Sequence, residues 1–295
     1  SWTKSLKIEA EVVTRAAATL FPTVPSLKAI TSSGANYPYL SPDGTKVAFL
    51  SASNLYTLDL SESPLGLLNR DPRLLSTLNS QLSTLIWSPD SKQILAVSTP
   101  SASLIDINQQ TSRLVASLSG LLSNWNLIQK TREDQKFAVL PLKLQNILAT
   151  AAADLVWSPK ENKLLYTATA SATIPDNLIR QLPGSSTQIQ SRALIEGKVY
   201  VYDTEEDRNF AVPYPPTNLQ WFSDSSHLIY TEKGQVTIFE YDNTNPAVIY
   251  SGPMQPYFSV PYPSGKQLLI LTNLSPASPS PTSSPVFNLY AISLR

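Results

Sequence analysis

The chain has 295 residues, of which 42% are hydrophobic and 15% are charged, and it contains no cysteine. Its 22 basic and 22 acidic residues balance to zero net charge, which argues against a nucleic-acid partner. The absence of cysteine excludes disulfides and thiolate chemistry. The sequence also has no run of about 18 apolar residues, the length needed to cross a bilayer. This uncharged polar composition favours a bacterial cell-envelope or extracellular location.

Residues 1–26 precede the repeated part of the chain. Apolar and polar residues alternate over residues 6–12, and Pro22 and Pro25 then interrupt the pattern. We expect an extra strand or the tail of a preceding domain. Because the chain begins with Ser1 rather than methionine, we expect a mature product or a piece of a longer protein, which leaves room for an upstream anchor.

Residues 27–295 carry a short pattern five times: an apolar strand end, a Ser-Pro-Asp-type turn and a hydrophobic strand. The copies read YLSPDGTKVAFL from Tyr39, IWSPDSKQILAV from Ile86, VWSPKENKLLYT from Val156, QWFSDSSHLIYT from Gln220 and VPYPSGKQLLIL from Val260. A repeated unit of this size cannot bury its apolar face alone, so the copies must stack on one another. The sequence therefore predicts an all-β fold, a β-propeller of four-stranded blades.

Two features of the repeat have a structural and a functional interpretation. The turn aspartates could bind a ligand such as calcium, but the chemistry of Pro and Asp favours a hairpin turn in which Asp accepts hydrogen bonds from backbone amides. Trp87, Trp157 and Trp221 recur at one position of the repeat. We expect them to pack between blades rather than to form a binding cage.

The repeat resembles the TolB-like or PD40 propeller repeat, a relative of WD40, most closely at residues 41–49. The resemblance covers about residues 27–295 and implies a propeller. It implies no single function, because the family includes partner-binding envelope proteins and non-catalytic propellers of peptidases. Two copies depart from the pattern, since Ser223 replaces the Pro and Ser264 replaces the Asp. Residues 1–26 also resemble the tail of a PEGA-type envelope domain.

The number of blades depends on the long interval between Pro89 and Pro159. This interval holds Trp125 and a strand-like stretch at residues 136–140, which we interpret as a worn repeat. Six blades are therefore favoured, with five as the alternative. Apolar residues at helical spacing over residues 144–151 predict a short helical insertion.

The two ends of the repeated region are expected to pair. The final repeat lacks a fourth strand after residues 287–294, and residues 27–31 form an apolar stretch without a partner of their own. Pairing of these N- and C-terminal strands would close the propeller domain of residues 27–295.

Two insertions indicate where the chain binds a partner, because loops on a rigid scaffold carry function. Residues 171–196 are rich in apolar side chains and are expected to dock on the chain's own propeller rather than on a partner. Residues 275–285 are rich in Ser and Pro and are expected to be extended. Blade connections with Tyr and Pro should share the same face, where they either recognise a partner or form stiff turns with Tyr packed on Pro. The candidate interaction face comprises Tyr37, Pro175, Asp176, Asn177, Leu178, Ile179, Arg180, Tyr214 and Tyr257.

No motif for catalysis, for a cofactor or for a metal emerges. His227 is the only histidine and occupies an ordinary strand-start position, and neither GxSxG, a P-loop, GxGxxG nor EF-hand spacing occurs. We therefore expect no enzyme, and we assign no catalytic residue, cofactor or metal ligand.

The favoured function is a non-catalytic protein- or glycan-interaction module of the bacterial cell envelope or exterior. It would bind through the propeller face that carries the 171–196 and 275–285 insertions. One alternative is a self-associating structural subunit of a surface layer or filament. A second is a glycan-active or peptidase-associated propeller, which would need a central pocket lined by carboxylates.

Overall fold

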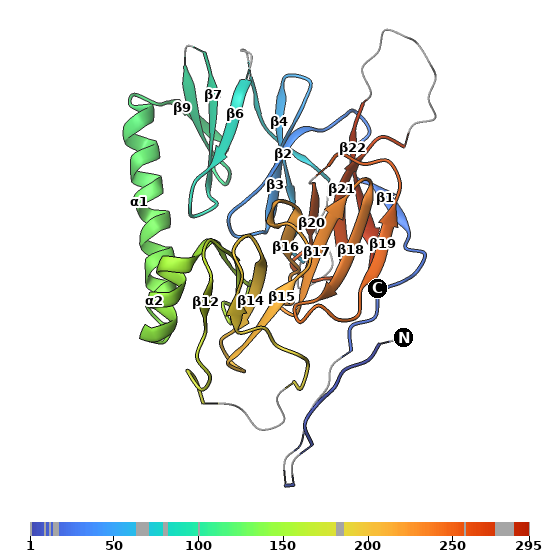
Figure 1. Ribbon diagram of the computed structural model, residues 1–295. Coiled ribbons are helices and arrows are strands. Elements are labelled where there is room, and N and C mark those ends of the chain that lie inside the picture. The colour runs from blue at the N-terminus through green and yellow to red at the C-terminus, as the bar shows by residue number, and fades with distance from the viewer. Residues whose placement is uncertain are drawn as a thin grey trace. The chain divides into compact units, whose positions relative to one another are not determined.

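The computed structural model describes residues 2–8, 10–11, 13, 18–62, 71–78, 82–99, 101–180, 186–256, 258–274 and 286–294 (Figure 1). Over these residues the chain forms five four-stranded antiparallel sheets, a two-stranded sheet and two α-helices. The chain divides into two compact units. Unit 1 comprises Ser1–Pro25, Asp134–Gly252 and Arg295, and unit 2 comprises Ser26–Glu133 and Pro253–Leu294.

Unit 2 contains three of the four-stranded sheets. The first consists of β2 (Asn36–Leu40), β3 (Lys46–Ser51), β4 (Asn54–Asp59) and β5 (Arg73–Thr77) in that order. The second consists of β6 (Leu82–Trp87), β7 (Gln93–Ser98), β8 (Ala102–Asp106) and β9 (Thr111–Leu114). In the third, β1 (Leu27–Ala29) pairs with β22 (Asn288–Ser293), followed by β21 (Gln267–Thr272) and β20 (Ser259–Pro261). Residues from both ends of the repeated region thus share one sheet.

Unit 1 contains the other two four-stranded sheets. One consists of β10 (Ala152–Trp157), β11 (Lys163–Ala168), β14 (Val199–Asp203) and β15 (Arg208–Val212). The other consists of β16 (Leu219–Trp221), β17 (His227–Glu232), β18 (Gln235–Glu240) and β19 (Ala247–Ser251), and the 3-10 helix η1 (Pro216–Asn218) precedes it. A small hairpin of β12 (Ala172–Thr173) and β13 (Ala193–Leu194) interrupts the first sheet between β11 and β14.

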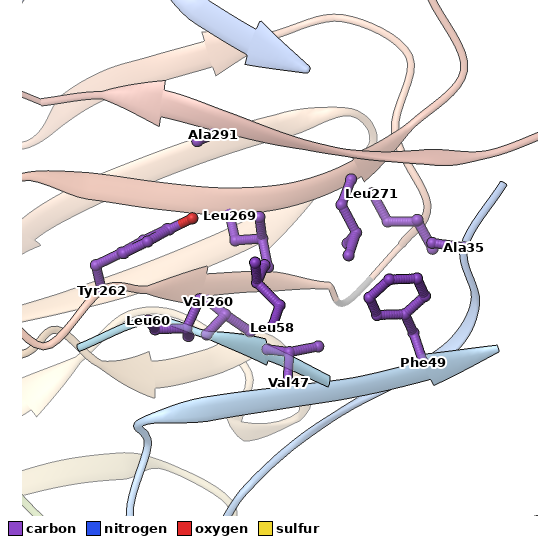
Figure 2. Packing of buried hydrophobic residues seen from close by; sticks show 11 residues of the cluster. Ala35, Val47, Phe49, Leu58, Leu60, Val260, Tyr262, Leu269, Leu271 and Ala291 are labelled. Atoms are coloured by element: carbon purple, nitrogen blue, oxygen red, sulfur yellow. The ribbon is translucent and has the colours of Figure 1, made fainter. Parts of the chain in front are cut away.

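The alternation of side chains along the strands packs neighbouring sheets of one unit on each other. In β3, Val47 and Phe49 enter one cluster, where they meet Leu269 and Leu271 of β21, as Figure 2 shows. The intervening Ala48 enters a second cluster with residues of β6 and β7. A strand that buries both faces in this way belongs to a stack of sheets. The predicted fold class, an all-β β-propeller, is confirmed by these repeated four-stranded antiparallel sheets.

The repeat turns have the structure that their sequence predicts. The Asp43 carboxylate accepts hydrogen bonds from the Ser41 hydroxyl at 2.6 Å and from the Thr45 amide at 3.0 Å. In the next repeat, Ser91 has a left-handed φ of 60°, and its hydroxyl accepts a hydrogen bond from the Asp43 amide at 3.0 Å. The turn interpretation of the aspartate is thus confirmed, and successive turns are linked to each other.

The repeated tryptophans also connect neighbouring sheets. The Trp87 indole donates to the Tyr39 carbonyl at 3.1 Å, and the Trp221 indole donates to the Val156 carbonyl at 3.0 Å. Both rings are buried, at 8% and 7% exposure. For these two residues the packing interpretation is confirmed.

The segment interpreted as a worn repeat is mainly helical. Helix α1 (Leu118–Phe137) includes Trp125, which packs against Leu95 and Leu104, and no strand forms at residues 136–140. That part of the prediction is wrong, because residues 121–137 contain many good helix formers and neither Gly nor Pro. The described strands form five four-stranded sheets, so the preference for six blades is not confirmed. The predicted short helix is confirmed as α2 (Leu142–Ala151).

Candidate functional site

The described part of the 171–196 insertion docks on unit 1. Strands β12 and β13 pair at its base, and α2 lies against β10 and β12 (Figure 1). Ile174 and Leu194 are 1% and 2% exposed and join a core cluster with Leu164 and Tyr166. Burial of two such side chains stabilises the base by about 3–6 kcal/mol of transfer free energy. The insertion is therefore part of the folded unit, as expected for docking on the chain's own sheets.

Arg192 fixes the first turn of the insertion. Its Nε lies 2.8 Å from the Asp176 carboxylate, and its Nη1 donates to the Pro175 carbonyl at 2.7 Å. Its Nη2 lies 3.3 Å from the Asp207 carboxylate and also donates to the Asp207 carbonyl. Because Arg presents its donors in a planar fork, these contacts fix both the position and the orientation of Pro175 and Asp176 relative to Asp207.

Asp207 anchors this arrangement from inside the unit. It is fully buried, and its carboxylate accepts hydrogen bonds from the Leu178 amide at 3.0 Å and the Tyr202 hydroxyl at 2.6 Å. Burial, together with the hydrogen bond to Asp207, raises the pKa of Tyr202 above its usual value, so this hydroxyl stays protonated as a donor. An amide, a hydroxyl and a guanidinium thus supply the partners that the buried Asp207 carboxylate needs.

The residues held by Arg192 and Asp207 form an exposed turn. Pro175, Asp176, Asn177 and Arg180 are exposed, whereas Leu178 and Ile179 are half-buried against the core. Asn177 has a left-handed φ of 57°, a conformation that Asn tolerates better than most residues. The structure thus brings six of the predicted site residues into one fixed turn, called here the 175–180 turn.

A cavity of about 250 Å³ adjoins this turn. Its lining includes Val139, Trp157, Ile179 and the ion pair of Lys136 with Glu161, whose Nζ and carboxylate lie 2.7 Å apart. Residue Val139 is 84% exposed at this site. An apolar hollow with a tryptophan wall and a charged rim suits an apolar side chain of a protein partner. We call it the Trp157 pocket.

Two of the three predicted tyrosines, Tyr37 and Tyr214, lie among the described residues. Tyr214 is half-buried and stacks on Tyr230 with ring centroids 4.3 Å apart, so it contributes to packing. Tyr37 is 67% exposed, has a φ of 51° and belongs to unit 2. Tyr257 and the 275–285 insertion lie outside the described residues. A common face for all nine residues stays a prediction.

Sequence reasoning did not single out Val139, Arg192 or Asp207. Val139 lies in the stretch interpreted as a strand, and Asp207 ends a run of acidic residues that is typical of a solvated loop. Trp157 stands out in the sequence by its place in the repeat, but that place indicates packing rather than a binding pocket. No local pattern relates Arg192 to Asp207, because their contact depends on the tertiary fold.

Other titratable groups of the described residues give no catalytic arrangement. His227 begins β17, as predicted, and its Nδ1 lies 2.7 Å from the Asp224 carboxylate. In the part of the chain that the structure describes, no group of three or more His, Cys, Asp or Glu residues is arranged to hold a metal ion. None of the described helices has both the length and the apolar character needed to span a membrane.

Comparison with known proteins gives structural matches without sequence matches. No family profile and no curated protein matches the chain. A protein of Agrobacterium tumefaciens named as a TolB is 14% identical, with 83% of this chain and 76% of that one covered and a TM-score of 0.28. TolB of Acinetobacter baumannii is 11% identical, with 88% and 54% covered and a TM-score of 0.30, so the chain spans about half of that protein.

A chain of a mitotic checkpoint complex is 13% identical, with 100% of this chain and 99% of that one covered and a TM-score of 0.43. All three TM-scores lie below 0.5, so these similarities carry no argument about the site. The fold assignment rests on the sheets described above. None of the matches bears on the PEGA-type resemblance of residues 1–26.

Proposed function

We propose that the chain is a non-catalytic protein-interaction module that binds its partner through the 175–180 turn and the Trp157 pocket. The observation that carries the proposal is the fixed turn itself. Arg192 and Asp207 hold exposed polar residues in one conformation beside an apolar hollow. A loop that is ordered before binding loses little conformational entropy when a partner docks.

The chemistry of the site favours a protein partner. Trp157 and Ile179 offer apolar contact area, and exposed Val139 would be covered by an inserted side chain. Asp176 and Arg180 supply opposite charges at the turn, which suits a polar rim around an apolar centre.

We place the module in the bacterial cell envelope or exterior. The low charged fraction of 15% and the resemblance of the repeat to TolB-like propellers support this location.

The test is quantitative affinity capture from the envelope fraction of the source organism. Wild-type chain is compared with Val139→Asp, which places a carboxylate in the Trp157 pocket, and with Val24→Asp as a matched control. The two valines are 84% and 88% exposed, so neither change should disturb folding. We expect Val139→Asp to reduce the captured partner about tenfold or more and Val24→Asp to leave it unchanged. Equal capture by all three chains would contradict the proposal.

A further inference from the structure

The N-terminal segment of unit 1 contacts polar residues where β18 connects to β19. The contact surface formed by Glu240, Asp242, Asn245, Ser186 and Thr187 is called here the groove. Its Trp2 indole donates to the Glu240 carboxylate at 2.5 Å, and Lys4 Nζ lies 2.7 Å from the other oxygen of the same carboxylate. One buried side chain thus contacts two residues of the segment that are two positions apart. Residues two apart point the same way in an extended chain, so this spacing selects extended peptide.

Asn245 contacts the backbone between these two side chains. Its Oδ1 accepts a hydrogen bond from the Thr3 amide at 3.0 Å, and its Nδ2 donates to the Thr3 carbonyl at 2.8 Å. This pair of bonds reproduces the pairing of one residue in a β-ladder. It imposes an extended backbone at Thr3 but sets no requirement on the Thr3 side chain.

The base of the groove carries more negative charge than one lysine neutralises. The Glu240 and Asp242 side chains are 5% and 0% exposed, and Lys4 Nζ lies 3.6 Å from Asp242 Oδ2. That Oδ2 atom has no hydrogen-bond partner among the described residues. Burial works against the charge of Lys4, but the hydrogen bond to Glu240 and the charge of Asp242 outweigh it and raise the lysine pKa. A buried pair of carboxylates therefore requires a cation at this position.

The segment continues from the groove onto the insertion. The Ser5 carbonyl accepts a hydrogen bond from the Thr187 amide at 3.2 Å, and Leu6 forms a β-bridge with Ser186. Beyond this bridge Ile8 and Val13 are 90% and 96% exposed, whereas Phe21 packs on Phe222 with ring centroids 5.9 Å apart. Residues 2–6 are thus held by the contacts described above, and the chain contacts the sheet again at Phe21.

We propose that this groove, formed by Glu240, Asp242, Asn245, Ser186 and Thr187, is a recognition site for an extended peptide with the sequence Trp-x-Lys. Residues 2–6 of the chain are its resident ligand in this structure. The indole and ammonium groups on one carboxylate supply side-chain specificity, and the amide of Asn245 and the Thr187 amide supply β-type backbone pairing. This inference does not depend on the Trp157 pocket.

The test uses the full chain and a synthetic peptide. The acetylated, fluorescently labelled peptide Trp-Thr-Lys-Ser-Leu-Lys, which corresponds to residues 2–7, is titrated with three chains and followed by fluorescence anisotropy. These are the wild type, Trp2→Ala/Lys4→Ala, called here the vacated chain because both side chains that contact Glu240 are removed, and the same double variant with Glu240→Gln. We expect binding by the vacated chain, and binding at least about tenfold weaker by the other two. A peptide with the order of its residues scrambled serves as the control for simple charge attraction.

Equal binding by the vacated chain and by its Glu240→Gln derivative would overturn the proposal, as would equal binding of the scrambled peptide. A second measurement covers the case in which the double variant folds poorly. In the otherwise native chain, Glu240→Gln should speed hydrogen exchange at residues 2–6 while β16–β19 remain protected. Unchanged exchange at residues 2–6 would also overturn the proposal. Because Val139→Asp leaves the groove intact, failure of the Trp157 pocket and failure of this site are distinguishable.

Discussion

Asp207 and Asp176 offer a controlled comparison, because both carboxylates contact Arg192. The Asp207 side chain is 0% exposed and the Asp176 side chain is 69% exposed. Replacing each by Asn removes a charge and changes little in shape. The account of the 175–180 turn predicts that Asp207→Asn is strongly destabilising and that Asp176→Asn is nearly neutral.

The magnitudes follow from burial. Breaking a buried ion pair costs about 3–5 kcal/mol, because the remaining charge stays buried without its counterion. Arg192 is 10% exposed and would keep its contacts with Asp176 and the Pro175 carbonyl. Asn at position 207 would keep one acceptor oxygen. We therefore expect a loss at the lower end of this range, about 3 kcal/mol. For the exposed pair with Asp176, the cost is about 0–1 kcal/mol.

Urea denaturation of the full chains measures the difference in free energy of unfolding. Hydrogen exchange then reports where the loss acts, and the Leu178 amide, which donates to Asp207, should lose protection. A loss below about 1 kcal/mol for Asp207→Asn, or equal losses for the two variants, would refute the assignment of Asp207 as the anchor.

Two further predictions concern the backbone and pH. Gly234 has a φ of +78°, and an added Cβ would lie 2.5 Å from the Gly252 carbonyl oxygen, whereas at Gly44, with a φ of +70°, it would meet nothing within 4 Å. We expect Gly44→Ala to cost about 1–2 kcal/mol and Gly234→Ala at least about 1 kcal/mol more, and equal melting temperatures of the two variants would contradict this. Burial opposes the charge of Glu240, but the hydrogen bond from Lys4 outweighs it and holds the Glu240 pKa below 4.5. This stabilisation is present above pH 4.5 and is lost as the pH falls through the lower pKa of Glu240 in the folded state. The difference in free energy of unfolding between wild type and Glu240→Gln should therefore shrink at low pH. A difference that stays constant with pH would contradict the ion pair.

The repeated sheets could be predicted because their signals are local. Alternation such as that of Val47, Ala48 and Phe49, and the chemistry of turns such as Ser41 to Asp43, act within a few residues of the chain. Turn residues also set a left-handed φ at Ser91, where the sequence offers no glycine. Such positions can be recognised only by their place in the repeat.

The features missed by sequence reasoning depend on distant contacts or weak patterns. Helix α1 has no continuous apolar stripe, and Trp125 is its single residue described as buried. The sequence pattern therefore does not distinguish this helix from a worn repeat. The groove for residues 2–6 joins groups more than 230 positions apart in the chain. No spacing within the sequence relates Lys4 to Glu240.

The central claim is that the 175–180 turn contacts a protein partner. The most direct measurement places a photo-reactive residue at Asn177 and, as a control, at Asn108, which is also exposed but belongs to unit 2. Both chains are irradiated with the envelope fraction of the source organism. We expect a discrete crosslinked protein from position 177 that is absent from position 108 and that Val139→Asp abolishes. Identical crosslinking from both positions, or none from position 177, would contradict it.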